Sequence, residues 1–130
     1  MVLRDEEGLL HCDDGPAVIT NSGRQEYWRH GERHRIGGPA VLFSDGGYEY
    51  WEDNKPHRLD GPAAYYVVGE IIEYLAQGNH HRLDGPAISK GDGYQSYRVK
   101  GIRHRADGPA TTHADGRLDY WLNGTRQHMP

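Results

Sequence analysis

The chain has 130 residues and a formal net charge of −4, and only 35% of its residues are hydrophobic. This balance gives no general attraction to nucleic-acid phosphates or to anionic membranes, and we expect direct binding to neither. Nine Tyr, three Trp and one Phe argue against intrinsic disorder, because disordered segments are depleted in aromatic residues.

The cysteine content and the hydropathy pattern bear on compartment. Cys12 is the only cysteine, so the chain has no disulfide framework and no thiol cluster for a metal. A reducing, cytoplasmic setting fits this composition. Residues 1–5 lack an apolar stretch, and we expect no secretory signal there. The longest apolar run, residues 63–68, is far shorter than a membrane span.

The tripeptide Gly-Pro-Ala returns five times, at steps of 23, 23, 24 and 23 residues. Its copies begin at Gly15, Gly38, Gly61, Gly85 and Gly108. A period of this size is typical of repeat proteins, in which small units bury a core only by stacking on their neighbours. We divide the single domain 1–130 into units 11–33, 34–56, 57–80, 81–103 and 104–127, with partial caps 1–10 and 128–130.

Each unit begins with His-Arg-x-Asp-Gly-Pro-Ala or a variant, continues through a short strand-like run to Asp-Gly, and then reaches Tyr-Trp and Asn-Gly. Asp45-Gly46, Asp92-Gly93 and Asp115-Gly116 each predict a hairpin with a two-residue type I′ turn. A second turn follows eight residues later, as at Asn123-Gly124. The sequence therefore predicts an all-β fold, an elongated and twisted antiparallel sheet of about five tandem β-hairpin repeats of 23–24 residues.

A two-residue hairpin loop would also set the register of each unit. It places Ile19 opposite Glu26 and Ala17 opposite Trp28, so these four side chains would share one face of the sheet. The opposite face would carry a tyrosine in every unit, at Tyr27, Tyr50, Tyr74, Tyr97 and Tyr120. A one-residue bulge would exchange the faces.

The run from Tyr120 to Gly124, Tyr-Trp-Leu-Asn-Gly, and its counterpart that begins at Tyr50 resemble the MORN repeat. The resemblance covers about residues 8 to 127. The loop His-Arg-x-Asp-Gly-Pro-Ala replaces the usual His-Gly-x-Gly and is more similar to divergent repeats of phage, large-virus and bacterial proteins, and to MORN-like variants labelled as bacterial antitoxins. The resemblance implies an elongated single-layer sheet that is used for binding and has no chemistry of its own.

One predicted face is our candidate partner-binding surface. Its residues are Trp28, Trp51, Trp121, Glu26, Glu49, Glu73 and Asp119. A single-layer sheet cannot bury both faces, and tryptophan is enriched at interface hot spots. In the structural alternative, each Trp only covers the small Ala opposite it and the acidic row is a solvated face. In a further alternative, the acidic row docks on a basic groove as a nucleic-acid mimic would.

The leading histidines occupy one repeat position, at His11, His34, His57, His81 and His104. Two strands per unit would separate them by about 10 Å. Zinc needs its ligands about 2 Å from one centre, so we expect no metal site and no cofactor. We expect each ring instead to brace its loop by hydrogen bonds to backbone carbonyls. The arginines that follow, such as Arg58, are expected to pair with an aspartate of the adjacent unit.

An enzymatic function is not expected, and we assign no catalytic residues. The one local candidate is Cys12 beside His11, and adjacency along an extended chain points the two side chains apart. The predicted function is non-enzymatic binding of a protein partner, as a small phage or bacterial protein that inhibits or neutralises it. The alternatives are a scaffold or homodimer that pairs through open sheet edges, and a protein that binds a lipid surface.

Overall fold

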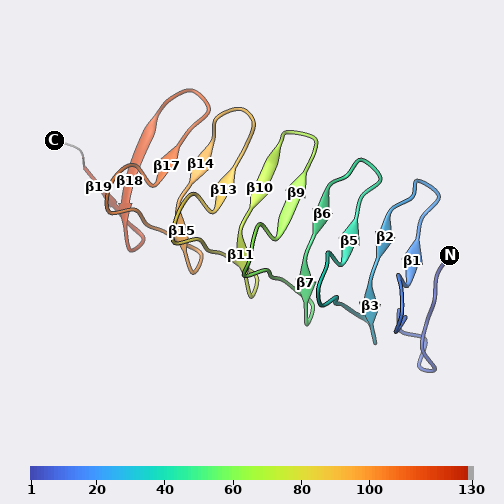
Figure 1. Cartoon of the computed structure of the whole chain (residues 1–130). Helices are drawn as coiled ribbons and strands as arrows, with labels where there is room; N and C mark the ends of the chain where they lie inside the picture. The colour runs from blue at the N-terminus through green and yellow to red at the C-terminus, as the bar shows by residue number, and fades with distance from the viewer. Residues whose placement is uncertain (129–130) are drawn as a thin grey trace.

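The computed structural model describes residues 1–128, which form tandem antiparallel β-hairpins and contain no helix (Figure 1). One 11-stranded sheet runs the length of the molecule. Its strands follow in the order β1 (Val18–Ile19), β2 (Gln25–Glu26), β5 (Val41–Leu42), β6 (Tyr48–Glu49), β9 (Ala64–Tyr66), β10 (Ile71–Glu73), β13 (Ile88–Ser89), β14 (Gln95–Ser96), β17 (Thr111–Thr112), β18 (Leu118–Leu122) and β19 (Thr125–Gln127). The predicted all-β array of hairpin repeats is confirmed.

A second, shorter hairpin follows the longer one in each of the first four units. These hairpins pair β3 (Trp28–Arg29) with β4 (Glu32–Arg33), β7 (Trp51–Glu52) with β8 (Lys55–Pro56), β11 (Leu75–Ala76) with β12 (Asn79–His80), and β15 (Arg98–Val99) with β16 (Ile102–Arg103). In the fifth unit β18 continues unbroken and pairs with β19. Figure 1 shows the long hairpins along one side of the molecule and the short hairpins along the other.

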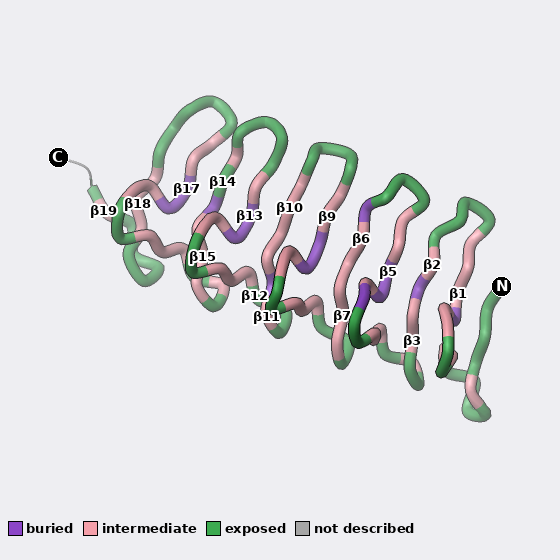
Figure 2. The backbone as a smooth tube through the Cα atoms, viewed as in Figure 1, coloured by how far each residue is buried: buried purple, intermediate pink, exposed green. Residues whose placement is uncertain are grey.

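The most buried residues lie where the long hairpins meet the short ones (Figure 2). The alanine of every Gly-Pro-Ala has no exposed surface, at Ala17, Ala40, Ala63, Ala87 and Ala110. The backbone explains this, because each alanine is bonded to the strands on both sides. In the second unit, the Ala40 N–H donates to the Glu49 carbonyl at 2.8 Å and the Ala40 carbonyl accepts from the Tyr27 N–H at 2.7 Å. A close-packed position of this kind favours a methyl group.

The turn of the long hairpin differs from the predicted type I′ turn. In the second unit the Gly46 N–H donates to the Phe43 carbonyl, and the Phe43 N–H donates to the Gly47 carbonyl, which closes a three-residue loop, 44–46. Gly46 has φ of +99°, whereas Asp45 is not in the left-handed region, so only one central residue has positive φ. The Asp45 carboxylate accepts the Gly47 N–H at 2.9 Å, which stabilises a type I turn followed by a glycine bulge. The type I′ prediction for Asp45-Gly46, Asp92-Gly93 and Asp115-Gly116 is therefore wrong.

The type I′ turns occur instead at the tips of the short hairpins. Both central residues there have positive φ, as at Asp53 (+50°) with Asn54 (+63°) and at Asn123 (+47°) with Gly124 (+82°). The same pair of left-handed residues recurs at His30-Gly31, Gln77-Gly78 and Lys100-Gly101. Two-residue loops of this type match the twist of the flanking strands.

The three-residue loop shifts the register by one residue from the predicted one. Val18, not Ile19, pairs with Glu26, and Ile19 pairs with Gln25. Continuing this register places Ala17 opposite Tyr27 rather than opposite Trp28. The predicted pairing of Trp28 with a covering alanine is therefore wrong, because the extra loop residue reverses the faces of the first strand relative to the second. The long hairpin of the third unit differs from the other four, since its loop has four residues, 67–70.

The two ends of the sheet differ. At the N-terminal end, Val2 bridges to Val18, and the Leu3 N–H donates to the Ala17 carbonyl at 2.7 Å, so the first residues cover the edge of β1. At the other end β19 is the last strand of the sheet. Of the predicted C-terminal cap, 128–130, residues 129–130 lie outside the described residues. Within residues 1–128, no helix is long and apolar enough to cross a membrane.

The two turn types predict opposite responses to glycine. Asn54 holds a left-handed conformation that glycine occupies in the corresponding turn of the other four units. Asn54→Gly should therefore raise stability by up to about 1 kcal/mol, less the contribution of the long 3.4 Å bond from the Arg33 N–H to Asn54 Oδ1. Asp45→Gly should instead lower stability, because it removes the carboxylate that accepts the Gly47 N–H. Urea unfolding of both variants checks this, and a stabilising Asp45→Gly would contradict the turn assignment.

Candidate functional site

The seven predicted contact residues lie on one face of the sheet. The four acidic residues share a face because an unbroken series of cross-strand pairs joins them. Glu26 pairs with Val41, Val41 with Glu49, Glu49 with Ala64 and Ala64 with Glu73, and the same series of pairs continues to Asp119. Each tryptophan follows one of these acidic residues by two positions and therefore lies on the same face, and all three tryptophans are half-buried. We call these seven residues, Trp28, Trp51, Trp121, Glu26, Glu49, Glu73 and Asp119, the Trp face.

Each of the first two tryptophans is held by the carboxylate two residues before it. Trp28 Nε1 donates to Glu26 Oε1 at 2.9 Å, and Trp51 Nε1 donates to Glu49 Oε1 at the same distance. Trp121 lacks this bond, and its Nε1 is buried without a partner among residues 1–128. The acidic residue there is Asp119, which is one methylene shorter and binds other groups.

Arginine side chains alternate with the indoles, which the sequence pattern did not predict. The Arg33 guanidinium carbon lies 5.1 Å from the ring centroids of both Trp28 and Trp51, so the cation is sandwiched between two repeats. Arg103 lies 5.1 Å from Trp121 and stacks on this one indole, because its cross-strand partner is Arg98 rather than a tryptophan. The register of the short hairpin could have revealed this contact from the sequence, because it pairs Arg33 with Trp28.

The acidic residues of the Trp face all have partners within the chain. Glu26 is only 5% exposed and also pairs with Arg24 at 2.9 Å. Glu49 Oε2 accepts from the Tyr66 hydroxyl at 2.6 Å, and Glu73 Oε1 lies 2.8 Å from His80 Nε2. These contacts leave little free negative charge for a partner along the row.

Asp119 binds His113 Nε2 at 2.7 Å and Arg126 at 2.9 Å. The hydrogen bond with His113, together with the charge of Arg126, holds the pKa of Asp119 below its usual range. The third and fourth units interrupt the tryptophans with Leu75, which is buried, and with Arg98, whose Nε donates to Ser96 Oγ at 3.0 Å. Trp121 is therefore three units from Trp51, or about 30 Å along the sheet.

The opposite face is covered by the loops that carry His-Arg-x-Asp-Gly-Pro. The Arg58 guanidinium lies 4.1 Å above the Tyr50 ring of the preceding unit. Its Nη1 donates to the Pro62 carbonyl at 3.1 Å, and its Nε donates to Asp60 Oδ1 at 2.9 Å. We call this set of contacts the arginine clamp.

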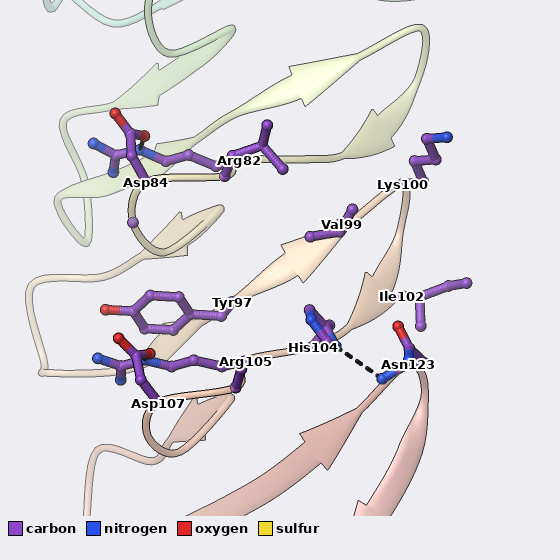
Figure 3. A pocket seen from close by; sticks show the side chains of 13 residues that line it. Arg82, Asp84, Tyr97, Val99, Lys100, Ile102, His104, Arg105, Asp107 and Asn123 are labelled. Atoms are coloured by element: carbon purple, nitrogen blue, oxygen red, sulfur yellow. Dashed lines mark hydrogen bonds and ion pairs between the residues drawn. The ribbon is translucent and has the colours of Figure 1, made fainter.

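The clamp recurs with nearly identical geometry in the next two units. Arg82 lies 4.0 Å from Tyr74 and Arg105 lies 4.0 Å from Tyr97, and Figure 3 shows Arg105 beside Tyr97 and Asp107. Arg35 stacks on Tyr27 but has Gly37 in place of the aspartate. The predicted pairing of each arginine with an aspartate of the adjacent unit is wrong, because the carboxylate two residues on already meets Nε.

The glycine of each loop makes room for the guanidinium. A Cβ on Gly61 would lie 2.9 Å from Arg58 Cζ, and Gly38, Gly85 and Gly108 are equally close to their own arginines. Gly15 has nothing within 4 Å of such a Cβ, and its unit has Cys12 in place of the arginine. The hydrogen bond from Arg58 also holds the pKa of Asp60 below its usual range, so this pair is lost only as the pH falls through that lowered value.

The residue that follows each of these arginines points outward, because the arginine occupies the inner side of the loop. Ile36, Leu59 and Leu83 are 76%, 83% and 81% exposed, and they occupy one repeat position. We call these three residues the loop ridge. Open grooves separate successive loops. The groove in Figure 3 lies between the loops of Arg82 and Arg105, and Tyr97 and Val99 contribute to its lining.

The histidines brace the type I′ turns rather than backbone carbonyls. Nδ1 of His57 accepts the backbone N–H of Gln77 at 2.9 Å, and the other four leading histidines each accept an N–H at the same turn position. The predicted bonds to carbonyls are therefore wrong, since the left-handed turn residue directs its N–H at the ring. In the part of the chain that the structure describes, no three metal-ligating side chains lie close enough to hold an ion.

The Cys12 thiol and the His11 imidazole, which a nucleophilic site would bring together, have different hydrogen-bond partners. The Cys12 thiol lies 3.4 Å from an Asp14 oxygen, whereas His11 Nε2 lies 2.8 Å from Asp13. His11 also stacks on His30 with 4.0 Å between ring centroids. The thiol and the imidazole thus engage different carboxylates.

The clamp predicts different costs for two chemically identical substitutions. Gly61→Ala should lower the free energy of unfolding by about 1–2 kcal/mol, because the new methyl displaces the Arg58 guanidinium. Gly15→Ala should change it by less than about 0.5 kcal/mol, because nothing lies in its way. Urea unfolding compares the two, and equal effects would contradict the steric role of the glycine.

No protein-family model matches this chain, and no curated protein matches it in sequence. The structure shows tandem antiparallel hairpins that follow the 23- to 24-residue period of the sequence. The chain is therefore a β-hairpin repeat protein by its architecture.

Proposed function

We propose that the chain is a non-enzymatic protein-binding module of MORN-like type. The observation that carries the proposal is the loop ridge, three large aliphatic side chains that are each more than three-quarters exposed at the same repeat position. Single exposed aliphatic residues are common on protein surfaces, but a row in register across three units is the kind of patch that a partner covers.

The clamp supports the proposal because it fixes the loops before a partner arrives. Each of the four loops that carry an arginine is held by a stacked cation, a carbonyl acceptor and, in three of them, an ion pair. A surface whose loops are already ordered loses less conformational entropy when it binds. This arrangement suits a protein that recognises one shape on its partner.

The Trp face remains a second candidate contact surface. Trp28, Arg33 and Trp51 form a stacked group that spans two units, and tryptophan and arginine are the residues most enriched at hot spots. The internal pairing of Glu26 and Glu49 weighs against mimicry of a nucleic acid, which would need free carboxylates. The partner-neutralising role follows from the resemblance to antitoxin-like repeats and belongs to the proposal.

The proposed function is tested by isolating the chain with its partner from the cells that produce it. We expect one protein to co-purify in a stoichiometric complex that re-forms from the two purified components. The intact mass of that partner should be the same before and after binding, since the function is not enzymatic. A modified partner would contradict the proposal, as would purification of the chain without any protein partner.

Two substitutions then assign the binding face. Leu59→Ser removes part of the loop ridge and Trp51→Ala removes part of the Trp face, with circular dichroism as the test that each variant is folded. We expect at least one of them to weaken the complex about tenfold or more, as hot-spot truncations do. Val68→Ser is the matched control, because Val68 is 81% exposed but lies in the turn of a long hairpin.

A further inference from the structure

The spacing of the loop ridge restricts what can bind along it. Each unit adds two strands to the long sheet, and strands lie about 4.8 Å apart, so neighbouring ridge positions are separated by about 10 Å. An α-helix advances by about 10.5 Å in seven residues. One helix laid along the loops would therefore present the same side of its surface to each successive groove.

The lining of the grooves favours an aliphatic contact over an aromatic one. Polyproline segments have a similar pitch, but they dock on exposed aromatic rings. In these loops an arginine stacks on one face of each of the rings of Tyr50, Tyr74 and Tyr97, and all three residues are half-buried where they line the grooves. The most exposed apolar side chains of these loops are the aliphatic residues Ile36, Leu59 and Leu83, which suit the apolar side of an amphipathic helix.

The outermost charges of the loops are negative. The carboxylates of Asp60, Asp84 and Asp107 are 88% exposed, whereas the side chains of their arginine partners are only 23–28% exposed. Each carboxylate meets Arg Nε through Oδ1, and the arginine is turned toward its tyrosine ring. A partner that approaches the loop ridge therefore meets a carboxylate beside Leu59 and another beside Leu83, and Asp107 continues this row in the next loop.

We propose that the loop ridge binds an amphipathic α-helix of a protein partner. The helix would carry one aliphatic residue at every seventh position, seated in the grooves between loops, with lysine or arginine beside it to face the aspartates. This inference rests on the proposed protein-binding function and names the side of the molecule and the partner chemistry. Residues 1–128 contain no helix, so a second copy of the described chain cannot supply it.

A displayed library of single helices tests the proposal with the full chain as the target. The main library places one aliphatic residue at every seventh position with flanking lysine or arginine. Two matched libraries change one property each: one has flanking glutamate, and the other spaces the aliphatic residues by five. We expect the basic seven-residue library alone to enrich binders. Absence of enrichment from it, or equal enrichment from all three, would overturn the proposal.

Variants of the protein identify the surface that the selected helices use. Leu59→Ser with Leu83→Ser should weaken binding of a selected helix about tenfold or more, while Val68→Ser should leave it unchanged. Asp60→Asn with Asp84→Asn keeps an acceptor for each arginine but removes the charge. This pair should weaken binding several-fold at low salt and flatten its salt dependence. Selected helices that bind the ridge variants normally would place the site elsewhere.

Two further outcomes separate this inference from the proposed function. If the natural complex depends on Trp51 but not on Leu59, the protein is a binding module and the loop ridge is not its site. If vesicles of anionic lipid bind the chain in a manner that depends on Leu59 and Leu83, the ridge is a membrane contact and the helix proposal fails. Carboxylates beside the ridge predict no such vesicle binding.

Discussion

The stacking of an arginine from one unit on the tyrosine of the unit before it is the contact on which the repeat depends. A hairpin of this size cannot bury a core alone, so each unit must be joined to its neighbour by side chains as well as by the sheet ladder. The clamp accounts for most of the repeat motif. Arginine supplies the flat cation, glycine leaves space for it, the proline carbonyl accepts Nη1, and aspartate accepts Nε.

The same contact links the fold to the proposed function. With the arginine turned inward onto its tyrosine, the residue that follows it has no place on the inner side of the loop. Ile36, Leu59 and Leu83 are therefore presented at a pitch that the sheet sets. The Trp face is built differently, because its carboxylates and cations are used to fix the indoles in place.

The sequence predicted the period, the hairpins and the residues that share the Trp face, because five copies of one pattern average out local ambiguity. The prediction failed where the same dipeptide is compatible with two turn types. Asp-Gly suits a type I′ turn, but the Asp45 carboxylate can also accept the Gly47 N–H and favour a three-residue loop. That single extra residue moved Val18 to the face assigned to Ile19.

Contacts between units were the other failure, because the sequence pattern gives no direction for a side chain. The Arg33 sandwich and the histidine bonds join residues that are 18 or more positions apart, as from His57 to Gln77. The exposure of Leu59 was missed for the same reason, since nothing in a loop of mixed polarity shows which residue faces solvent. These features follow from tertiary packing rather than from local propensity.

A double-mutant cycle between Arg82 and Tyr74 tests the central role of the clamp most directly. Arg82→Met and Tyr74→Leu are compared singly and together by urea unfolding, and the cycle of Arg82 with the distant Tyr27 is the control. We expect a coupling energy of about 1 kcal/mol or more for the stacked pair and none within error for the control. Additive effects for Arg82 and Tyr74 would show that this stacking does not help to hold the units together and would contradict the central role of the clamp.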